Sequence, residues 1–352
     1  MIEYLELKNF RNFRERSFQF NSGNVVLSGP NGSGKSSVLE SLGYLSILRS
    51  FRGAKSRDMV TLGEHGFELK CRYRHNNRKS LLQVTENSSG KRELLIGGAR
   101  PLRTSDFIKE FRCVAFVPED REIVSGASGC RRRFFDMMIS SIDPSYLKSL
   151  SDYNRALMQR NRALKSGRAD VACHFDLELA ERTPEISSRR AAYAEIIGRR
   201  VNELMKENNS SFEIRYLTST SMEKDQNLFL LRKTLEKDRQ RKCTSFGPQL
   251  DEFEFRLDNK VMRSYCSTGQ KGIVALMLKL AEFAVVKQES SVPVAVLADD
   301  VLCDLDQRNS ELFLEKIQSA DQRFFTFAGV PSYGNFSEYE TIQLQEQQEE
   351  KK

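Results

Sequence analysis

The sequence predicts an α/β protein in which two β-rich segments enclose a mainly helical one. In the first 120 residues, apolar and polar positions alternate in short runs, as they do in half-buried strands. From residue 131 to about residue 208, apolar residues recur at three- and four-residue spacing with few glycines or prolines, which is typical of helices. Strand character then returns from residue 212. This order indicates mixed β-sheets with helices, assembled from both ends of the chain around an inserted helical arm.

The individual elements follow from the same patterns. In the first segment we expect one helix from about residue 34 to Ser46, and strands at Ile2–Leu7, Val25–Leu27, Phe67–Arg74, Ser80–Thr85, Glu93–Ile96 and Cys113–Val117. After the arm we expect a long helix at Gly269–Lys287, and strands at Phe212–Leu217, Glu252–Leu257, Pro293–Ala298 and Arg323–Phe327. Residues 336–352 form a polar tail in which, from Gln343 onward, only Leu344 is apolar, so we expect disorder there.

Composition indicates a soluble, cytoplasmic protein. Of the 352 residues, 39% are hydrophobic and 29% charged, and no apolar run reaches the ~18 residues of a membrane span. The first residues, MIEYLELKNF, suit a strand better than a signal peptide. Seven cysteines without a C-x-x-C pair and only three histidines exclude a zinc site. Between residues 121 and 242 there are 24 basic and 17 acidic residues, which is the whole net charge of +7. A polyanion such as nucleic acid fits this segment, as does an ordinary solvated helical surface.

The strongest motif is GPNGSGKS, which matches the phosphate-binding pattern G-x-x-x-x-G-K-[ST] between a strand and a helix. Backbone N–H groups and the helix N-terminus would surround phosphate, and Lys35 would reach the β and γ phosphates. The Ser36 hydroxyl is placed to bind Mg²⁺. We therefore predict ATP and Mg²⁺ as cofactors, with the nucleotide held by Gly29, Pro30, Asn31, Gly32, Ser33, Gly34, Lys35, Ser36 and Ser37. The alternative is a glycine-rich turn before a helix.

A buried-looking strand, VAVLADD, ends in two acids and supplies the carboxylates that such a loop needs. Asp299 would hold Mg²⁺ through water together with Ser36. Asp300 would polarise the attacking water, which makes it a catalytic residue together with Lys35. Two acids after a strand can also begin an ordinary loop.

A third segment, CSTGQKG, precedes the long helix. It resembles the signature loop of ATP-binding-cassette (ABC) proteins, which binds the γ-phosphate held by a second subunit. This resemblance gives Ser267, Gly269 and Gln270 a nucleotide-binding role and implies an ATP-dependent homodimer. As an isolated string, S-T-G-Q is equally consistent with a simple helix cap. The loop lies about 230 residues after the first motif, whereas transporter cassettes separate the two by about 100, so a large insertion is present.

Several stretches in order between residues 5 and 306 resemble the RecF family. They are LELKNFRNF, SFRGAKSRDMV, FVPEDREIVSG, CRRRFFD, LMQRNRAL, GPQLDEFEF, CSTGQKG and LADDVLCDLD. The resemblance implies an ABC-type P-loop ATPase head with an inserted arm, which dimerises on ATP and binds DNA without sequence preference. It also implies that RecO and RecR are partners and that RecA loading at gaps is assisted. The residues themselves give no sign of a membrane partner. On this basis the parts are the head (1–122 and 241–335), the arm (123–240) and the tail (336–352).

Further residues are weaker candidates, each with an ordinary surface role as the alternative. Arg11 is a candidate nucleotide contact, and Glu119 lies where cassettes place the loop that senses Mg²⁺. Candidates for DNA phosphate contacts are Arg52, Lys55 and Arg57, and the triplet Arg131, Arg132 and Arg133.

Other positions depart from the family pattern. The segment 247–251 reads GPQLD where the family has residues like GPHRD, and Thr268 stands where the signature loop has arginine. Thr326 and Phe327 close the last strand without a switch histidine, so we expect slow hydrolysis. Asp306 keeps a position that contacts the opposite subunit in related proteins.

Two other functions remain as alternatives. An SMC-like ATPase of DNA maintenance or defence would carry a nuclease or a long heptad coil, and the arm is too short for sustained heptads. The motor of a transporter would have closely spaced motifs and a switch histidine, and the sequence has neither.

Overall fold

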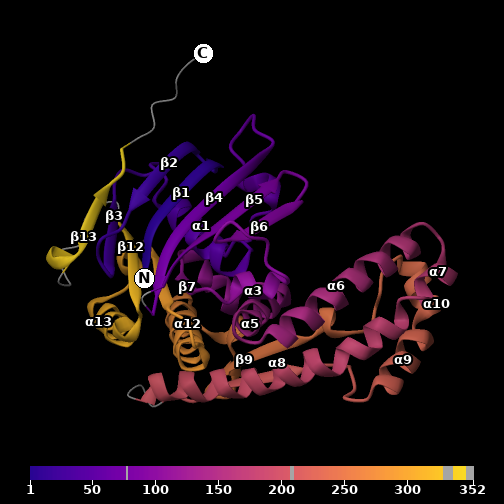
Figure 1. Ribbon diagram of the computed structural model, residues 1–352. Coiled ribbons are helices and arrows are strands. Elements are labelled where there is room, and N and C mark those ends of the chain that lie inside the picture. Colours follow the sequence, from indigo (N-terminus) through magenta and orange to yellow (C-terminus); the bar gives the residue numbers. More distant parts are fainter. Residues whose placement is uncertain (77, 207–209, 328–335, 346–352) are drawn as a thin grey trace. The chain divides into compact units, whose positions relative to one another are not determined.

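The computed structural model describes residues 1–76, 78–206, 210–327 and 336–345. They form two compact units. The head unit contains Met1–Asp120 and the described residues from Glu282 onward, and the inserted unit contains Arg121–Ala281. Figure 1 shows the elements of both units. Among the described residues, no helix combines the length and the apolar character that crossing a bilayer requires.

One layer of the head unit is an antiparallel five-stranded sheet in the order β2-β1-β4-β5-β6. Its strands are β1 Ile2–Phe10, β2 Phe13–Gln19, β4 Gly66–His75, β5 Arg78–Asn87 and β6 Arg92–Ile96. Alternate residues of β1 and β4 are buried, as expected for strands with one covered face. On that face Phe67 meets Phe10 and Tyr44 edge to face, with ring centroids 5.1 and 5.5 Å away.

The second sheet of the head unit is parallel and combines both ends of the chain. Its order is β13-β3-β12-β11-β7, and every neighbouring pair is parallel. The strands are β3 Asn24–Ser28, β7 Arg112–Phe116, β11 Val294–Asp299, β12 Gln322–Phe327 and β13 Glu340–Gln343. All six residues of β11 are buried, because a central parallel strand is covered on both faces. The helices of this unit are α1 Lys35–Ile47, α2 Ser56–Met59, α3 Thr104–Ile108 and α13 Gln307–Lys316, with 3₁₀ turns at Pro118–Asp120, Val301–Asp304, Ile317–Ser319 and Phe336–Glu338.

The predicted α/β class is confirmed, and most expected strands lie within two or three residues of their observed ends. Strand β2 was missed. Of its seven residues only Phe13 and Phe18 are buried, and their odd spacing hides the alternation that marks a strand. The strand forms because six of its seven residues pair with β1.

The prediction that residues 336–352 are a disordered tail is wrong for the described residues 336–345. Phe336 is buried against Phe325, Phe327 and Tyr339, with ring centroids 5.0 to 5.3 Å apart. Strand β13 then pairs with β3, and the Leu344 amide donates to the Ser28 carbonyl at 2.7 Å. The aromatic contacts and backbone pairing offset the polar composition on which the prediction was based. The rest of the predicted tail, 346–352, lies outside the described residues.

The inserted unit is mainly helical, as predicted, and also holds a small antiparallel sheet. The sheet order is β10-β9-β8, with β8 Phe212–Leu217, β9 Glu252–Leu257 and β10 Lys260–Val261. Its helices are α4 Arg121–Ser125, α5 Ser128–Ile142, α6 Pro144–Lys165, α7 Ala169–Cys173, α8 Asp176–Leu204, α9 Lys224–Lys233, α10 Leu235–Arg241 and α11 Met262–Tyr265, with a 3₁₀ turn at Pro248–Leu250. Helix α12, Thr268–Glu289, begins in this unit.

Of the two boundaries between the units, the first is close to its predicted position and the second is far from it. The first lies after residue 120, where 122 was expected. The second was expected at 240/241, but residues 241–281 belong to the inserted unit. The reason is that β9 pairs with β8 over six residues, and that Phe253 of β9 stacks on Phe135 of α5 with ring centroids 4.0 Å apart.

Two buried arginines organise this unit. Arg160 is fully buried and donates to Asp176 at 2.8 Å and Asp238 at 2.7 Å. Arg190 donates to both oxygens of Asp136 at 2.9 Å, and also to Asp251 at 2.9 Å. Buried charges need such partners because desolvation is costly. Part of the basic character of this segment is therefore internal and structural.

Candidate nucleotide site

The phosphate-binding loop lies between β3 and α1, as its pattern requires. Gly29, Gly32 and Gly34 all have positive φ angles, of 157°, 85° and 96°. Gly34 precedes the first residue of α1 in the left-handed conformation, and a Cβ atom there would overlap the ring of Phe13. Only glycine fits this combination of backbone and space. The loop is therefore shaped to leave backbone N–H groups free at a helix N-terminus, where anions bind.

Lys35 is the buried cation of this loop. Its ammonium donates to the carbonyl oxygens of Gly29 at 2.7 Å and Pro30 at 2.9 Å. An ammonium group has three protons, so one donor remains for a phosphate oxygen. The side chain is held at the mouth of the loop without an acidic partner among the residues that the structure describes.

The predicted metal ligands come together from distant parts of the sequence. The Ser36 hydroxyl donates to Asp299 Oδ1 at 2.8 Å, across 263 residues of chain. Thr326 donates to the same oxygen at 2.8 Å, and its hydroxyl accepts the Asp300 amide at 2.9 Å. A hydroxyl and a carboxylate are hard oxygen ligands that suit Mg²⁺, whose other ligands are usually water and phosphate. The described part of the chain holds no cluster of three or more metal-binding side chains, and such a site needs none.

A cleft of about 500 Å³ opens over these groups. It is lined by Arg11, Asn12, Asn31, Gly32, Gly34, Lys35, Ser36, Ser37, Arg52, Asp58, Val60 and Asp300. The predicted catalytic pair, Lys35 and Asp300, thus shares one cavity. Asp300 has a left-handed backbone with φ 52°, which turns the chain at the end of β11. The cavity and its donors fit a nucleotide phosphate chain.

Two weaker candidates also line this cleft. The guanidinium of Arg11 donates to both oxygens of buried Glu40 at 2.7 Å and to the Asp58 carbonyl at 2.6 Å. Arg52 forms an ion pair with Glu119 at 3.5 Å. Arg52 therefore belongs to the nucleotide cleft, although the sequence suggested it for DNA. Glu119 lies near the cleft through this pair, as its position after β7 indicated.

Within the triplet at 131–133, Arg131 does not behave as predicted. Arg131 is only 4% exposed, and it donates to both oxygens of Glu252 at 2.7 and 2.9 Å. Arg132 donates to the Asp251 carbonyl at 2.7 Å. The expected phosphate contact through Arg131 is wrong, because the residue is a buried structural cation. Lys55, Arg57 and Arg133 are exposed.

The signature loop lies in the inserted unit and caps α12. The Ser267 amide donates to Gln270 Oε1 at 2.9 Å, and the Gln270 amide donates to the Ser267 hydroxyl at 3.2 Å. This is a capping box, so the helix-cap alternative is present in the structure. Ser267, Gly269 and Gln270 are nevertheless exposed, and a Cβ on Gly269 would meet nothing within 4 Å. Capping and an exposed binding surface are compatible here.

Sequence reasoning missed the role of two residues. In the sequence Thr326 stands out only because it replaces a histidine, yet its hydroxyl orients Asp299 and holds the Asp300 backbone. Its position at the carboxyl end of a buried strand was the available signal. Glu40 gave no signal in the sequence, because it lies within an apolar helix and is buried against Arg11.

A parallel sheet that brings a phosphate-binding loop next to an acidic strand end is the head of an ABC-type ATPase, and here a long insertion interrupts that head. The chain matches the model of the RecF/RecN/SMC N terminal domain over residues 1–328 and belongs to that family. Within it, the chain belongs to the RecF group.

The relatives span nearly the whole chain. The DNA replication and repair protein RecF of Halalkalibacterium halodurans is 31% identical over 345 residues, 94% of this chain and 93% of its own length. RecF of Leptospira interrogans is 32% identical with the same coverage. Solved structures of the recombination mediator protein RecF-ATPrS and RecF-ATP in the RecFOR pathway superpose with a TM-score of 0.84 at 29% identity. They cover 95% of this chain, and 94% and 93% of their own chains.

Proposed function

We propose that this protein is an ATP-controlled DNA clamp of recombinational repair. ATP with Mg²⁺ occupies the cleft over Lys35, two copies join through their signature loops, and the joined form binds DNA without sequence preference. Together with RecO and RecR it assists the loading of RecA at gaps. The observation that carries the proposal is the hydrogen bond between Ser36 and Asp299 beside the Lys35 ammonium.

The residues of the cleft have separate tasks in this proposal. Lys35 and the N–H groups of the loop bind phosphate, and Ser36 and Asp299 hold the metal ion. Thr326 fixes the rotamer of Asp299, and Asp300 orients and polarises water. Bound Mg²⁺ would neutralise the charge that develops on the phosphates.

Dimerisation is supported by the exposed signature loop. Ser267, Gly269 and Gln270 lie at the N-terminus of α12, a helix of 22 residues, where the helix dipole favours an anion. Half of each nucleotide site would then come from the second copy. ATP would shift the monomer–dimer equilibrium because it binds the joined form more tightly.

The proposal that DNA, RecO and RecR are partners is based on the relatives of this chain. These are called DNA replication and repair proteins, and the solved structures are placed in the RecFOR pathway. The net charge of +7 agrees with a polyanion such as DNA as a partner.

The test is the molar mass in solution of Asp300→Asn, which should bind ATP and fail to hydrolyse it. We expect one copy, 40.4 kDa, without nucleotide and two copies with ATP and Mg²⁺, measured by light scattering. Lys35→Ala is the matched control and should stay monomeric, because it loses the charged contact to phosphate. A constant mass of Asp300→Asn despite measured ATP binding would contradict the shared site. Unchanged turnover in this variant would place the catalytic carboxylate elsewhere.

A further inference from the structure

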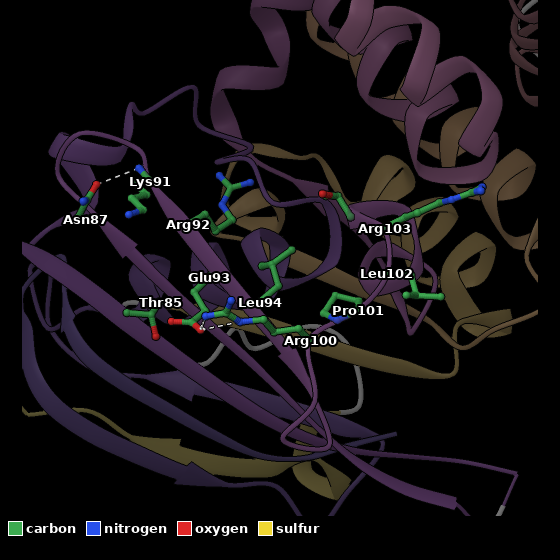
Figure 2. A pocket seen from close by; sticks show the side chains of 11 residues that line it. Thr85, Asn87, Lys91, Arg92, Glu93, Leu94, Arg100, Pro101, Leu102 and Arg103 are labelled. Carbon is green, nitrogen blue, oxygen red and sulfur yellow. Dashed lines mark hydrogen bonds and ion pairs between the residues drawn. The ribbon is translucent and has the colours of Figure 1, made fainter.

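A second concave site lies in the head unit, apart from the nucleotide cleft. It has a volume of about 610 Å³, and it shares no lining residue with that cleft. Its walls come from the end of β5, from β6 and from the segment that leads into α3. Four cations line it with one acid: Lys91, Arg92, Arg100 and Arg103, with Glu93. Figure 2 shows these side chains along the edge strand and the segment beside it.

The chain makes this site by folding back beside β6. Gly97 and Gly98 have φ angles of 58° and 85°, and Ile96 and Ala99 exchange backbone hydrogen bonds of 2.8 and 3.1 Å. Two consecutive left-handed residues produce a tight reversal of the type that joins hairpin strands. Arg100 is thereby brought back to Glu93, with which it forms an ion pair. The Gly-Gly turn therefore determines the position of this wall of the pocket.

The cations of the site are not equally compensated. Arg92 donates to fully buried Glu86 at 2.6 Å, and Arg100 is paired with Glu93. No acidic side chain of the described residues lies within ion-pair distance of Lys91 or Arg103. Asp106 is the nearest acid in sequence to Arg103, and it accepts the backbone amide of that residue at 3.1 Å. Two positive charges thus remain for a ligand.

The remaining polar groups suit the same ligand. Thr85 and Thr104 add hydroxyl groups to the lining. The side-chain oxygen of Asn87 accepts the Lys91 backbone amide at 2.9 Å. The side-chain nitrogen of Asn87 therefore remains as a donor. These cationic and neutral hydrogen-bond donors, with two positive charges that no acid compensates, suit a simple oxyanion such as a phosphate group. Nothing in the lining resembles an element that reads bases.

We propose that this pocket binds phosphate groups of the DNA backbone, with Lys91 and Arg103 as the principal contacts. The proposal rests on the proposed function, which supplies DNA as the polyanion. It replaces Arg131 and Arg52 as the predicted phosphate contacts, since both are engaged elsewhere. Binding through phosphates is independent of sequence and weakens with salt, because each contact releases condensed counterions.

The experiment compares two double variants of the full chain. Lys91→Gln with Arg103→Gln removes the two uncompensated charges. Arg14→Gln with Arg16→Gln removes two exposed charges from β2, at the opposite edge of the same sheet. Binding of short fluorescein-labelled single-stranded and duplex DNA is followed by anisotropy with ATP and Mg²⁺, between about 50 and 200 mM salt. Melting temperature and ATP affinity are measured alongside for each protein.

For the pocket variant we expect several-fold weaker binding of duplex DNA. We also expect the slope of log K against log salt to fall by about 1.8, or about 0.9 for each lost phosphate contact. Melting temperature and ATP affinity should stay unchanged, and the β2 control should bind DNA as the wild type does.

Three results would overturn the pocket assignment. Equal DNA binding by wild type and pocket variant would refute it and leave the proposed function standing. No DNA binding by any of the proteins would reject both. Binding of a labelled polyglutamate peptide by the wild type but not by the pocket variant, with DNA binding unchanged, would assign the site to an acidic protein partner instead.

Discussion

At the scale of residues, the pair of Arg131 and Glu252 shows that an arginine of a basic triplet can stabilise the fold. Burial alone would raise the pKa of Glu252, but the hydrogen bonds and charge of Arg131 outweigh it and hold that pKa below its usual value. Arg131 is almost fully buried, while the Glu252 side chain is one-third exposed. The carboxylate therefore stabilises the folded state only in its charged form.

This pair leads to a pH-dependent prediction. Because the folded pKa is lowered, the contribution is present above the usual pKa of about 4.5 and is lost as pH falls through the folded value. Glu252→Gln should lower the free energy of unfolding by roughly 1–3 kcal/mol at pH 7, less than for a fully buried pair. The difference from wild type should shrink as pH falls below about 4.5.

The measurement is urea unfolding at neutral and acidic pH. Glu254→Gln is the control on the same strand, because its pair with Arg256 is partly exposed on both sides. A difference for Glu252→Gln that stays constant across pH would show that the ion pair does not stabilise the fold.

At the scale of elements, the N-terminus of α12 has a structural role and, in the proposed function, a binding role as well. Ser267 caps the helix and also occupies the signature position. Ser267→Arg should keep ATP binding by the monomer and block ATP-dependent dimerisation, because a long cation replaces the hydroxyl at the shared surface. Ser267→Ala removes the cap, at a cost of about 1 kcal/mol, together with one hydroxyl contact to phosphate, but it adds neither bulk nor charge to the shared surface.

Light scattering with ATP and Mg²⁺ distinguishes these variants. We expect a dimer for Ser267→Ala in the Asp300→Asn background and a monomer for Ser267→Arg in the same background. If the arginine variant dimerises as well, the signature surface does not lie at the dimer contact.

The same scale shows where sequence patterns are informative. The phosphate loop could be predicted because its pattern, its strand and its helix are local in sequence, and the acids after β11 follow a buried strand. Strand β2 and the terminal strand β13 could not, since β2 buries only two side chains and β13 depends on pairing with β3 and on the Phe336 cluster. The role of Arg131 could not be predicted either, because its burial is set by β9, more than a hundred residues away.

At the scale of the whole molecule, the parallel sheet explains why the motifs are far apart. Strands β3 and β7 come from the first 120 residues, but neither contacts the other in the sheet. β12 and β11 lie between them and follow the insertion in sequence. The site is thus completed only when the last strands pair, because Asp299 and Thr326 arrive with them.

A chain split after Asp120 tests this dependence. Residues 1–120 expressed alone should show no cooperative thermal unfolding and no ATP binding, because β3 then lacks both its neighbours, β12 and β13, and β7 lacks its neighbour β11. Co-expressed with residues 121–352, they should purify as a complex that binds ATP, since every strand of the sheet is then present and the break falls between exposed or half-exposed residues. Calorimetry and ATP titration of the fragment and of the complex give both results. If the fragment alone unfolds cooperatively and binds ATP, the phosphate loop folds without the strands that carry its carboxylate, and the long separation of the motifs has another cause.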